Sequence, residues 1–431
     1  MMKKPVLLTF VLVVVTTTAF YLGRMSAPAP RFISQPGDDL SAAFEEYQRG
    51  QRETLALMQG HPLFANPQMR AEAYRGVLYA TVGSIRTAAL TDLDHPRFIR
   101  AADWSAKSGL DNPDNNYYFA KIRDDEDYVI RGHRGSSRNL IFQLVVGQPG
   151  VRDAGSSTNV SVLNARDMQM EVDGTFEILV SRQDPGDGRN WLANGAGAQT
   201  LMARMTFSDW QAEHKGYLTI EKVEGEGLAK PVLTSEEMAF RLREIAVHMY
   251  DRTASWLQLG ERAWLAMPRN ALSDPAHARG GLVGQWWSFG SWQLEDDEAL
   301  IIRSHRSNAS YQGIELGNRW FVSLDYETRT SSLTLDQAEV APDGSYYFVV
   351  AGKDPGVYNW LDTEAHKSGL IMMRWQGLTG DLPESLKPRA WKVPLAEIGQ
   401  HLPEDTRYIS SADRRAQIAA RRMALQRRDA G

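Results

Sequence analysis

The chain repeats part of its own sequence, and this repeat limits the folds it can adopt. "DDEDYVIRGHRG" from Asp124 matches "DDEALIIRSHRS" from Asp296, "VDGTFEILVSRQDPG" matches "PDGSYYFVVAGKDPG", and "LMARM" matches "IMMRW". The offset stays between 169 and 172 residues over some 80 positions. A constant offset of this kind predicts one structural unit that is present twice.

Each copy has the pattern of an antiparallel β unit. Short alternating stretches such as "DYVIRGHRG" are separated by Gly, Asp and Pro, which is typical of strands joined by tight turns. We therefore predict a β-sandwich unit over residues 111–230 and a second one over residues 276–400. Together with the helices predicted around them, they give an α+β fold class.

Residues 39–110 are predicted to form a helical region. One helix spans roughly Asp39 to Gln59, and the next opens at Asn66 and Pro67, a capping residue followed by a proline in the first turn. Apolar residues at near-helical spacing predict a stripe that faces the core, formed by Tyr74, Leu78 and Ile85.

Residues 231–275 are predicted to form a helical connector between the β units. Thr234 and Glu237 have the spacing of a capping box, which starts a helix, and another helical segment follows before Pro268. Residues 401–431 form a basic tail that is predicted to be helical. It either lies on an anionic membrane surface or is a solvated tail; the alanine-rich apolar side favours the second interpretation.

The N-terminus predicts a membrane anchor. An uncharged run from Pro5 to Gly23 lies within residues 1–24, and about 20 apolar residues cross a bilayer. Lys3 and Lys4 precede the run, so the positive-inside rule places the rest of the chain outside the cytoplasm. We predict a single-pass inner-membrane protein whose bulk lies in the periplasm, tethered by a linker at residues 25–38. The alternative is a cleaved signal peptide and a periplasmic protein.

Composition and missing motifs exclude several functions. A net charge of −5 argues against a nucleic-acid partner, and the absence of cysteine removes disulfides and thiolate chemistry. The chain has no P-loop, no GxGxxG after a strand, no HExxH and no GxSxG, so no cofactor is predicted. The nine histidines are scattered, so no metal site is predicted either, and only long-range folding could assemble one.

The two copies share a turn. In both, a strand ends in Asp-Pro-Gly, which is typical of a type II turn, and an Asn-Trp pair follows. The pair is Asn190 and Trp191 in the first copy and Asn359 and Trp360 in the second. We predict that the pair fixes the loop to the fold, and the alternative is that Asn359 and Trp360 bind a ligand.

After the tryptophan the copies differ, because only the second carries Asp362, Glu364 and His366. One interpretation is that Asp362 caps a short helical turn. The other is an acid/base site in which Asp362, or Asp325 from an earlier loop, works with His366, because a carboxylate that orients an imidazole suits proton transfer near neutral pH.

The second copy also holds a dense polar and aromatic stretch, "LGNRWFVSLDYETRTSSL", whose counterpart in the first copy lacks this character. Arginines beside aromatic faces suit an anionic or hydroxylated ligand, although a structural salt-bridge network fits equally well. The candidate ligand-binding residues here are Arg319, Trp320, Tyr326 and Arg329.

The stretches "NRWFVSLDYETRTSSL" and "DGSYYFVVAGKDPGVYNWLDTEAHKSGLIMMRW" resemble a bacterial family called domain of unknown function 1214. The resemblance covers residues 281–376 and takes in "DNPDNNYYFAKI" at Asp111. It implies a β-sandwich or jelly-roll build and no particular reaction. The family is often found beside a domain numbered 1254, of which this chain has no clear counterpart.

Three functions remain open. The first is binding of a small apolar or hydroxylated ligand, such as a lipid, terpenoid or saccharide, in the second β unit. The second is a cofactor-independent hydrolase or lyase that uses the Asp/His pair, and the third is a scaffold in a membrane complex. Twelve tryptophans and the arginine-rich stretch favour the first.

Overall fold

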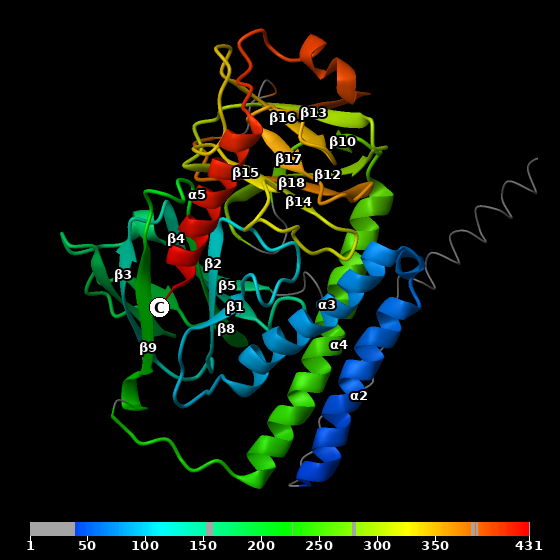
Figure 1. The fold of residues 1–431 in the computed structure, drawn as a ribbon. Coiled ribbons are helices and arrows are strands. Elements are labelled where there is room, and N and C mark those ends of the chain that lie inside the picture. The colour runs from blue at the N-terminus through cyan, green and yellow to red at the C-terminus, as the bar shows by residue number, and fades with distance from the viewer. Residues whose placement is uncertain are drawn as a thin grey trace, which may run out of the picture.

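The fold is mixed α+β, with two β units beside a layer of helices, as seen in a computed structural model (Figure 1). The structure describes residues 39–151, 158–225, 227–277, 282–380, 384 and 387–430. The predicted anchor and linker, residues 1–38, lie outside the described residues. Among the helices that are described, none combines the length and the apolar character needed to cross a bilayer.

The first β unit contains two sheets. One has the strand order β1 (Ile99–Ala102), β2 (Asn115–Lys121), β8 (Ala198–Thr206), β4 (Asn139–Val146), β5 (Asn159–Asn164). The other has the order β7 (Trp191–Ala193), β6 (Thr175–Ser181), β3 (Tyr128–Gly135), β9 (Lys215–Lys222).

The second β unit also contains two sheets. One has the order β10 (Ala271–Leu272), β12 (Gln285–Gln293), β18 (Ser368–Gln376), β14 (Tyr311–Gly317), β15 (Ser332–Thr334), with β11 (Ala276–His277) also paired to β12. The other has the order β17 (Trp360–Asp362), β16 (Ser345–Ala351), β13 (Glu298–His305), β19 (Arg389–Pro394).

The strand orders of the two units correspond strand for strand. Even the exceptions agree, because β6 pairs with β7 in parallel and β16 pairs with β17 in parallel, while the other pairings among the described strands are antiparallel. In each unit the two sheets enclose an apolar core; the cores include Phe142 and Ile178 in the first unit and Trp292 and Phe348 in the second. Alternation along each strand supplies these inward-facing side chains.

The sheets begin earlier in the chain than the predicted β ranges. β1 lies before residue 111 and β10 lies before residue 276, so each unit gains an edge strand from a segment that the sequence pattern assigned to helical regions. Both strands are short, four residues and two residues, and neither is long enough to show a clear alternation.

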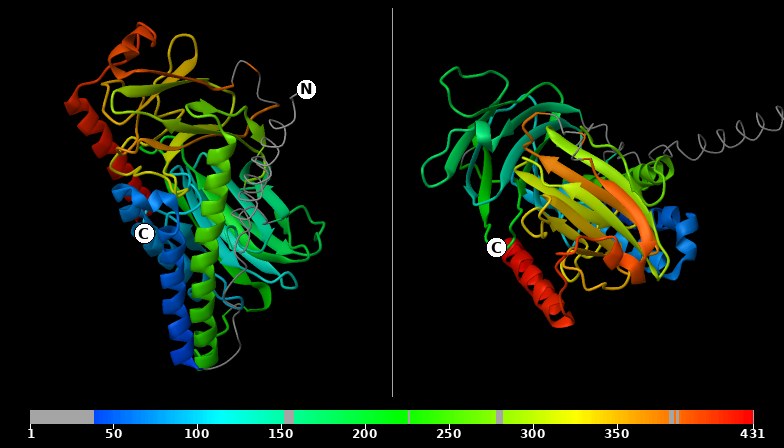
Figure 2. Two further views of the ribbon diagram at one scale, coloured as in Figure 1. Left: turned by 90° about the vertical axis from the view of Figure 1, so that its right-hand side faces the viewer. Right: turned by 90° about the horizontal axis from the view of Figure 1, so that it is seen from above.

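Four α-helices complete the described fold: α2 (Leu40–Gln59), α3 (Pro67–Ser84), α4 (Ser235–Ala266) and α5 (Ser411–Asp429). Single 3₁₀ turns lie at Pro62–Ala65, Ala165–Asp167, Val223–Gly225 and Leu395–Gln400, and a π-helical turn at Ile85–Ala89 follows α3. α4 packs against α2 and α3 and runs along both β units (Figures 1 and 2).

The predicted starts of α2, α3 and α4 are confirmed. Asp39 accepts a hydrogen bond from the backbone N–H of Ala42, Asn66 caps α3 ahead of Pro67, and Thr234 accepts from the N–H of Glu237. These side chains satisfy N–H groups that have no partner within the helix.

Two helix predictions differ from the structure. The Tyr74 and Leu78 side chains are exposed, because α3 buries its smaller face, which includes Ala73, against α4 and the second β unit. The connector holds one continuous helix, α4, in place of two segments. Gly260 lies inside this helix without interrupting it. A side chain would not fit at this position, because an added Cβ would lie 3.0 Å from the Cβ of Phe321.

The C-terminal helix α5 lies across both β units (Figure 2). Three of its arginines are buried against the protein, Arg414, Arg421 and Arg428, while Arg415, Arg422 and Arg427 are exposed. Arg421 donates to the carbonyl of Tyr326 in the second unit, and Arg428 donates to the carbonyl of Pro113 in the first. The helix is therefore docked on the protein by one row of arginines, whereas the sequence favoured a solvated tail.

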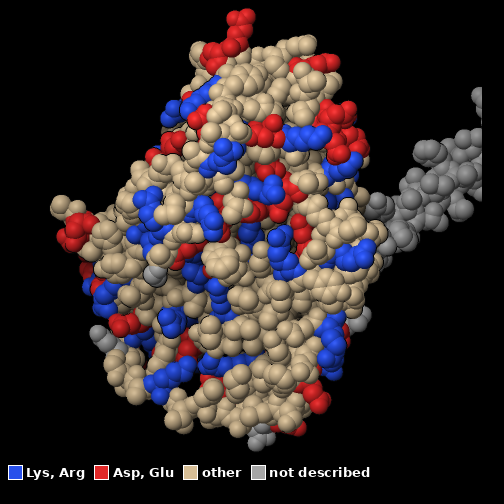
Figure 3. All heavy atoms as spheres, in the orientation of Figure 1, with Lys and Arg blue, Asp and Glu red and all other residues tan. Residues whose placement is uncertain are grey.

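Exposed charges of both signs are interspersed over the face shown in Figure 3. Many charged residues of the described chain are paired, as in the ion pairs of Arg422 with Glu327 and of Arg100 with Asp429. Such pairs contribute little to stability individually, and they leave this face without a field of one sign.

Candidate functional site

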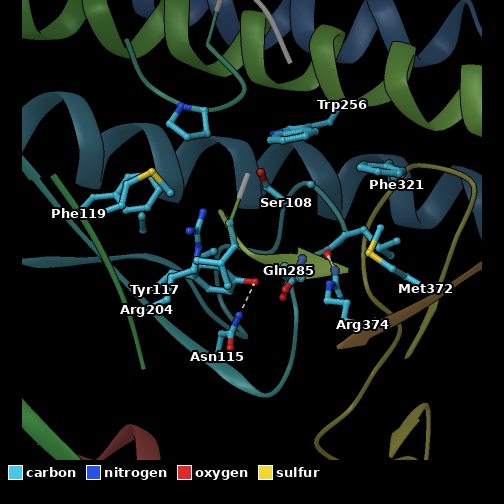
Figure 4. A pocket seen from close by; sticks show the side chains of 18 of the residues that line it. Ser108, Asn115, Tyr117, Phe119, Arg204, Trp256, Gln285, Phe321, Met372 and Arg374 are labelled. Atoms are coloured by element: carbon cyan, nitrogen blue, oxygen red, sulfur yellow. Dashed lines mark hydrogen bonds between the residues drawn. The ribbon is translucent and has the colours of Figure 1, made fainter. Parts of the chain in front are cut away.

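A cavity of about 210 Å³ lies where the two β units meet α4 (Figure 4). Its walls come from β2, β4 and β8 of the first unit, from β12 and β18 of the second, from α4, and from the loops around residues 108–111 and 321. The cavity is therefore built from segments that are far apart in the sequence.

Equivalent strands of the two units present matching side chains to this cavity. In the first unit, Tyr117 on β2 lies opposite Arg204 on β8. In the second, Trp287 on β12 lies opposite Arg374 on β18. Each residue of one pair is 170 positions from its counterpart (287 − 117 and 374 − 204). Further along the same strands, the lining also includes Met202 and Met372.

The two arginines differ in their partners. Arg204 donates a hydrogen bond of 2.9 Å to the side-chain oxygen of Gln143 on β4. Arg374 donates to the carboxyl group of Glu315 on β14 and, at 2.9 Å, to the carbonyl of Leu110. Since Gln143 pairs with Met202 and Glu315 pairs with Met372, the amide and the carboxyl group occupy equivalent positions.

This difference changes the charge of the cavity wall. Burial lowers the pKa of Arg204 to about 10 but leaves it protonated near neutral pH, and among the described residues it forms no ion pair. Burial raises the pKa of Glu315 to about 8, although the guanidinium of Arg374 acts in the opposite direction. Arg204 thus has a neutral partner at any pH, whereas Arg374 has an ionisable one.

A third buried arginine comes from α4. Arg252 donates to the hydroxyl of Ser108 at 3.2 Å, and its Nε and Nη1 atoms have no hydrogen-bond partner among the described residues. Burial alone lowers the pKa of its guanidinium to about 10. A buried cation without a counter-charge is costly, and the described residues supply none to Arg252.

One carboxyl group, that of Asp111, is also in the cavity wall. Burial raises its pKa, and it accepts a hydrogen bond of 2.9 Å from the hydroxyl of Ser323, with the cation of Lys107 nearby. The wall therefore holds three arginines and one carboxyl group that already has partners. Its electrostatic balance favours an anion.

Aromatic side chains form the apolar part of the cavity. Trp256 on α4 stacks on Phe321, with ring centroids 5.9 Å apart, and both point toward the cavity in Figure 4. The Nε1 atom of Trp256 is buried and has no hydrogen-bond partner in the described part of the chain. The ring fits closely against Gly109, where an added Cβ would lie 2.8 Å from it.

The loops that carry these groups have strained backbones. Leu110 has a φ of 51° and Phe321 has a φ of 61°, both in the left-handed region that residues other than glycine rarely adopt. The N–H of Leu110 donates a hydrogen bond of 2.8 Å to the carbonyl of Phe321, which links the two strained residues directly. Strain of this kind collects at functional sites.

The arrangement combines an apolar volume with donors that lack partners. It can hold a small molecule with an apolar body and one acidic group, because a carboxylate accepts two hydrogen bonds from a guanidinium in a planar pair. Among the described residues that line the cavity, no hydrogen bond joins a nucleophile to a base.

Comparison with solved structures finds a protein that has a similar fold. The chain is similar to an uncharacterised protein from Burkholderia cenocepacia. The two are 26% identical, with a TM-score of 0.72 over 83% of this chain and 97% of the other. A Vibrio parahaemolyticus protein is 11% identical, with a TM-score of 0.41 over 74% of this chain and 98% of the other. No family model and no curated protein matches the chain.

The predicted acid/base residues lie elsewhere and have separate partners. Asp362 is buried and forms an ion pair of 2.7 Å with Arg329, and its other oxygen accepts from the N–H of Glu364. Asp325 accepts from the N–H groups of Glu327 and Thr328, as a turn-capping aspartate does. Of the two interpretations of Asp362, these contacts agree better with the one in which it caps a turn.

His366 is buried and contacts a residue that the sequence pattern did not connect with it. Its Nε2 atom lies 2.9 Å from a carboxylate oxygen of Glu72 on α3. Among the described residues no hydrogen bond joins His366 to Asp362 or to Asp325.

The predicted ligand-binding arginine and tryptophan in "NRW" have partners within the protein. Arg319 pairs with Glu261 at 2.8 Å and stacks over Trp264, and Trp320 donates its indole N–H to the carbonyl of Met69. Neither lines the 210 Å³ cavity, although Trp320 lines a smaller one of about 40 Å³ next to it.

The remaining predicted ligand-binding residues also have internal contacts. The Tyr326 ring is buried under the ammonium group of Lys107, 3.9 Å from its centroid. Asn359 exchanges hydrogen bonds with the backbone of Glu339, and Trp360 donates to the carbonyl of Ala351.

The first copy makes the corresponding contacts. Asn190 bonds the backbone of Gln169, and Trp191 donates to the carbonyl of Ser181. These shared contacts agree with the prediction that the Asn-Trp pair fixes the loop to the fold.

Sequence reasoning did not select the cavity arginines, although the signal was present. Arg204 and Arg374 are the shared arginines of "LMARM" and "IMMRW". A charged residue between apolar neighbours in the middle of a strand, present in both copies, indicates a buried cation with a specific partner.

Proposed function

We propose that the chain binds a small anionic molecule with an apolar body in the cavity between its two β units. The observation that carries the proposal is Arg252, a buried guanidinium with no carboxylate partner in the described part of the chain. It lines the same cavity as Arg204, whose hydrogen-bond partner is a neutral amide. A ligand carboxylate would supply the counter-charge.

The size of the cavity limits the ligand. A cavity of about 150 Å³ holds benzene, so one of 210 Å³ suits a somewhat larger molecule, such as an arylcarboxylate or a medium-chain fatty acid. This proposal keeps the small-ligand function predicted from the sequence, makes the ligand acidic, and moves the site from the second unit to the boundary of both.

Two alternatives from the sequence have less support. The predicted hydrolase or lyase would use Asp362 or Asp325 with His366, whereas Asp362 is paired with Arg329 and Asp325 caps a turn. The carboxylate beside His366 is that of Glu72. A scaffold would need no cavity of this kind. The observed contacts favour ligand binding over both.

The setting of the protein is also part of the proposal. We propose that the two β units arose by duplication, that they have a β-sandwich or jelly-roll build as in domain 1214, and that an N-terminal anchor holds the chain at the periplasmic face of the inner membrane. The matching strand orders support the duplication. Protease treatment of spheroplasts tests the location, because a periplasmic chain is digested and a cytoplasmic one survives.

The binding proposal is tested by direct titration of the full-length chain with benzoate, phenylacetate and octanoate, each paired with its neutral amide. We expect the acids to bind and the amides to bind at least about tenfold more weakly, about 1.4 kcal/mol. Arg204→Gln should reduce acid binding, whereas Arg131→Gln, at an exposed ion pair on β3, should leave it unchanged. Equal affinity for acids and amides would exclude the proposal.

A further inference from the structure

A second cluster of polar groups joins α3 to the loop between β17 and β18. Glu72 on α3 and Glu364 and His366 in the loop each present one ligand-type atom, and the three atoms lie within 4.8 Å of one another. Glu72 and His366 are both more than nine-tenths buried. Glu72 and His366 are 294 positions apart in the sequence, so only the folded chain brings them together.

Outer contacts hold each carboxylate in a defined orientation. The side chain of Asn318 donates to Oε2 of Glu72 at 2.8 Å, and the N–H of Asp325 donates to Oε2 of Glu364 at 3.2 Å. The Oε1 atom of Glu364 has no hydrogen-bond partner among the described residues. Such outer hydrogen bonds orient the ligands in metal sites.

The imidazole of His366 has conflicting neighbours. Its Nε2 atom lies 2.9 Å from Oε1 of Glu72 and 3.1 Å from the amide nitrogen of Gln68. That amide nitrogen also donates to the carbonyl of Glu364 at 2.8 Å, which fixes its orientation. A ring nitrogen either donates or accepts, so one of its two contacts is unfavourable in each protonation state. A cation resolves the conflict with Glu72, because lone pairs of the imidazole and the carboxylate can both point at it.

The loop reaches this geometry through an unusual backbone. Glu364 and Ala365 have φ values of 54° and 60°, two successive residues in the left-handed region. Neither is glycine, so this conformation is unfavourable for both residues and has to be held by the surrounding contacts. It places Glu364 and His366 on the side of the loop that faces α3.

We propose that Glu72, Glu364 and His366 bind a divalent cation, with zinc or manganese as the ion class. One imidazole and two carboxylates suit these ions, whereas calcium prefers oxygen ligands alone. The guanidinium of Arg75 lies 3.4 Å from Oε1 of Glu72 and competes with the cation, but this side chain is about half exposed and can turn toward solvent. The cation ties α3 to the second β unit, and the proposal does not depend on anion binding in the cavity.

The test uses the full-length chain, stripped of metal by chelation and dialysis. Titration with zinc and with manganese should show about one equivalent bound with a rise in melting temperature, and Co²⁺ should give visible absorption bands from imidazole and carboxylate ligation. Glu364→Gln keeps the shape and the bond to Asp325 while removing the charge. It should weaken metal binding roughly 100-fold and leave the melting temperature of the metal-free protein near that of the wild type.

Glu327→Gln is the matched control, since Glu327 lies on a neighbouring loop and pairs with Arg422. It should bind zinc as the wild type does. The proposal is overturned if the wild-type chain binds none of the three ions, or if Glu364→Gln and His366→Gln bind them as tightly as Glu327→Gln.

Discussion

Gln143 and Glu315 occupy equivalent positions on β4 and β14, and each accepts a hydrogen bond from the arginine of the neighbouring strand. The two units thus present the same guanidinium to one cavity with different counter-groups. An amide cannot cancel the charge of Arg204, whereas a carboxyl group can cancel that of Arg374 once it ionises. This difference adds to the electrostatic asymmetry of a cavity whose two sides are built from equivalent strands.

Gln143→Glu should weaken anion binding by giving Arg204 a carboxyl partner like that of Arg374. The change is almost isosteric, and at about pH 9 the new carboxylate should lower the affinity for an arylcarboxylate about tenfold or more. Isothermal titration of the variant and the wild type measures it. Glu315→Gln should act in the opposite direction, so a loss of affinity in both variants would contradict the charge argument.

Anion binding should fall as the pH rises through about 8. Burial raises the pKa of the Glu315 carboxyl from its ordinary value of 4.5 to about 8, so this group is neutral below that pH and Arg374 keeps its full charge. Above it, Glu315 ionises and the cavity loses one net positive charge. Titrations between about pH 6 and pH 9 follow the change, and the Glu315→Gln variant should show a flatter profile.

The same shift affects stability. Because the folded protein holds the Glu315 proton more tightly than the unfolded chain does, the free energy of unfolding should decrease between about pH 4.5 and 8 through this group. A smaller decrease in Glu315→Gln, measured by urea unfolding, would identify the contribution.

Arg252→Met should stabilise the ligand-free protein and weaken anion binding. The guanidinium is buried, and two of its nitrogens have no hydrogen-bond partner among the residues that the structure describes. Replacing it by an apolar side chain should therefore remove a cost of about 1–3 kcal/mol. Urea unfolding of extracted, ligand-free protein measures the gain. Arg241→Met on the same helix is the control; it should destabilise, because Arg241 pairs with Glu237 and donates to the carbonyl of Ala89.

Arg421→Ala should destabilise the contact between the β units by about 2–4 kcal/mol. Its guanidinium donates to Tyr326 and Ser332 of the second unit and lies 4.1 Å from the ring centroid of Trp210 of the first. Thermal unfolding should show a lower or a split transition. The adjacent exposed Arg422→Ala should change stability by about 0.5 kcal/mol at most, and similar losses in both variants would contradict the bridging role.

Local sequence signals predicted local structure well. The caps at Asp39, Asn66 and Thr234 lie where the helices begin, and the Asp-Pro-Gly segments form turns in which the aspartate at 184 or 354 accepts from the glycine N–H. These features depend on residues a few positions apart. The spacing of Tyr74 and Leu78 predicted burial, and this prediction is wrong. The sequence of one helix does not show which of its faces the neighbouring elements will cover.

The candidate site required information that no single segment holds. Arg204 and Arg374 occur at equivalent positions of the repeat, which the sequence shows. Their common cavity, however, forms only because the two units face each other beside Arg252 of α4. Likewise, His366 meets Glu72 through the packing of α3 on the second unit. The predicted site residues Asp362 and His366 lie in a loop where the two copies differ, whereas the cavity difference between Gln143 and Glu315 lies inside equivalent strands.

The position of α5 has a consequence for how far the two units can move against each other. Along one helix, Arg421 donates to the carbonyl of Tyr326 in the second unit and Arg428 donates to the carbonyl of Pro113 in the first. Moving the units apart would leave one of these buried guanidinium groups without its acceptor, which is costly. The helix therefore opposes any widening of the cavity that lies between the units.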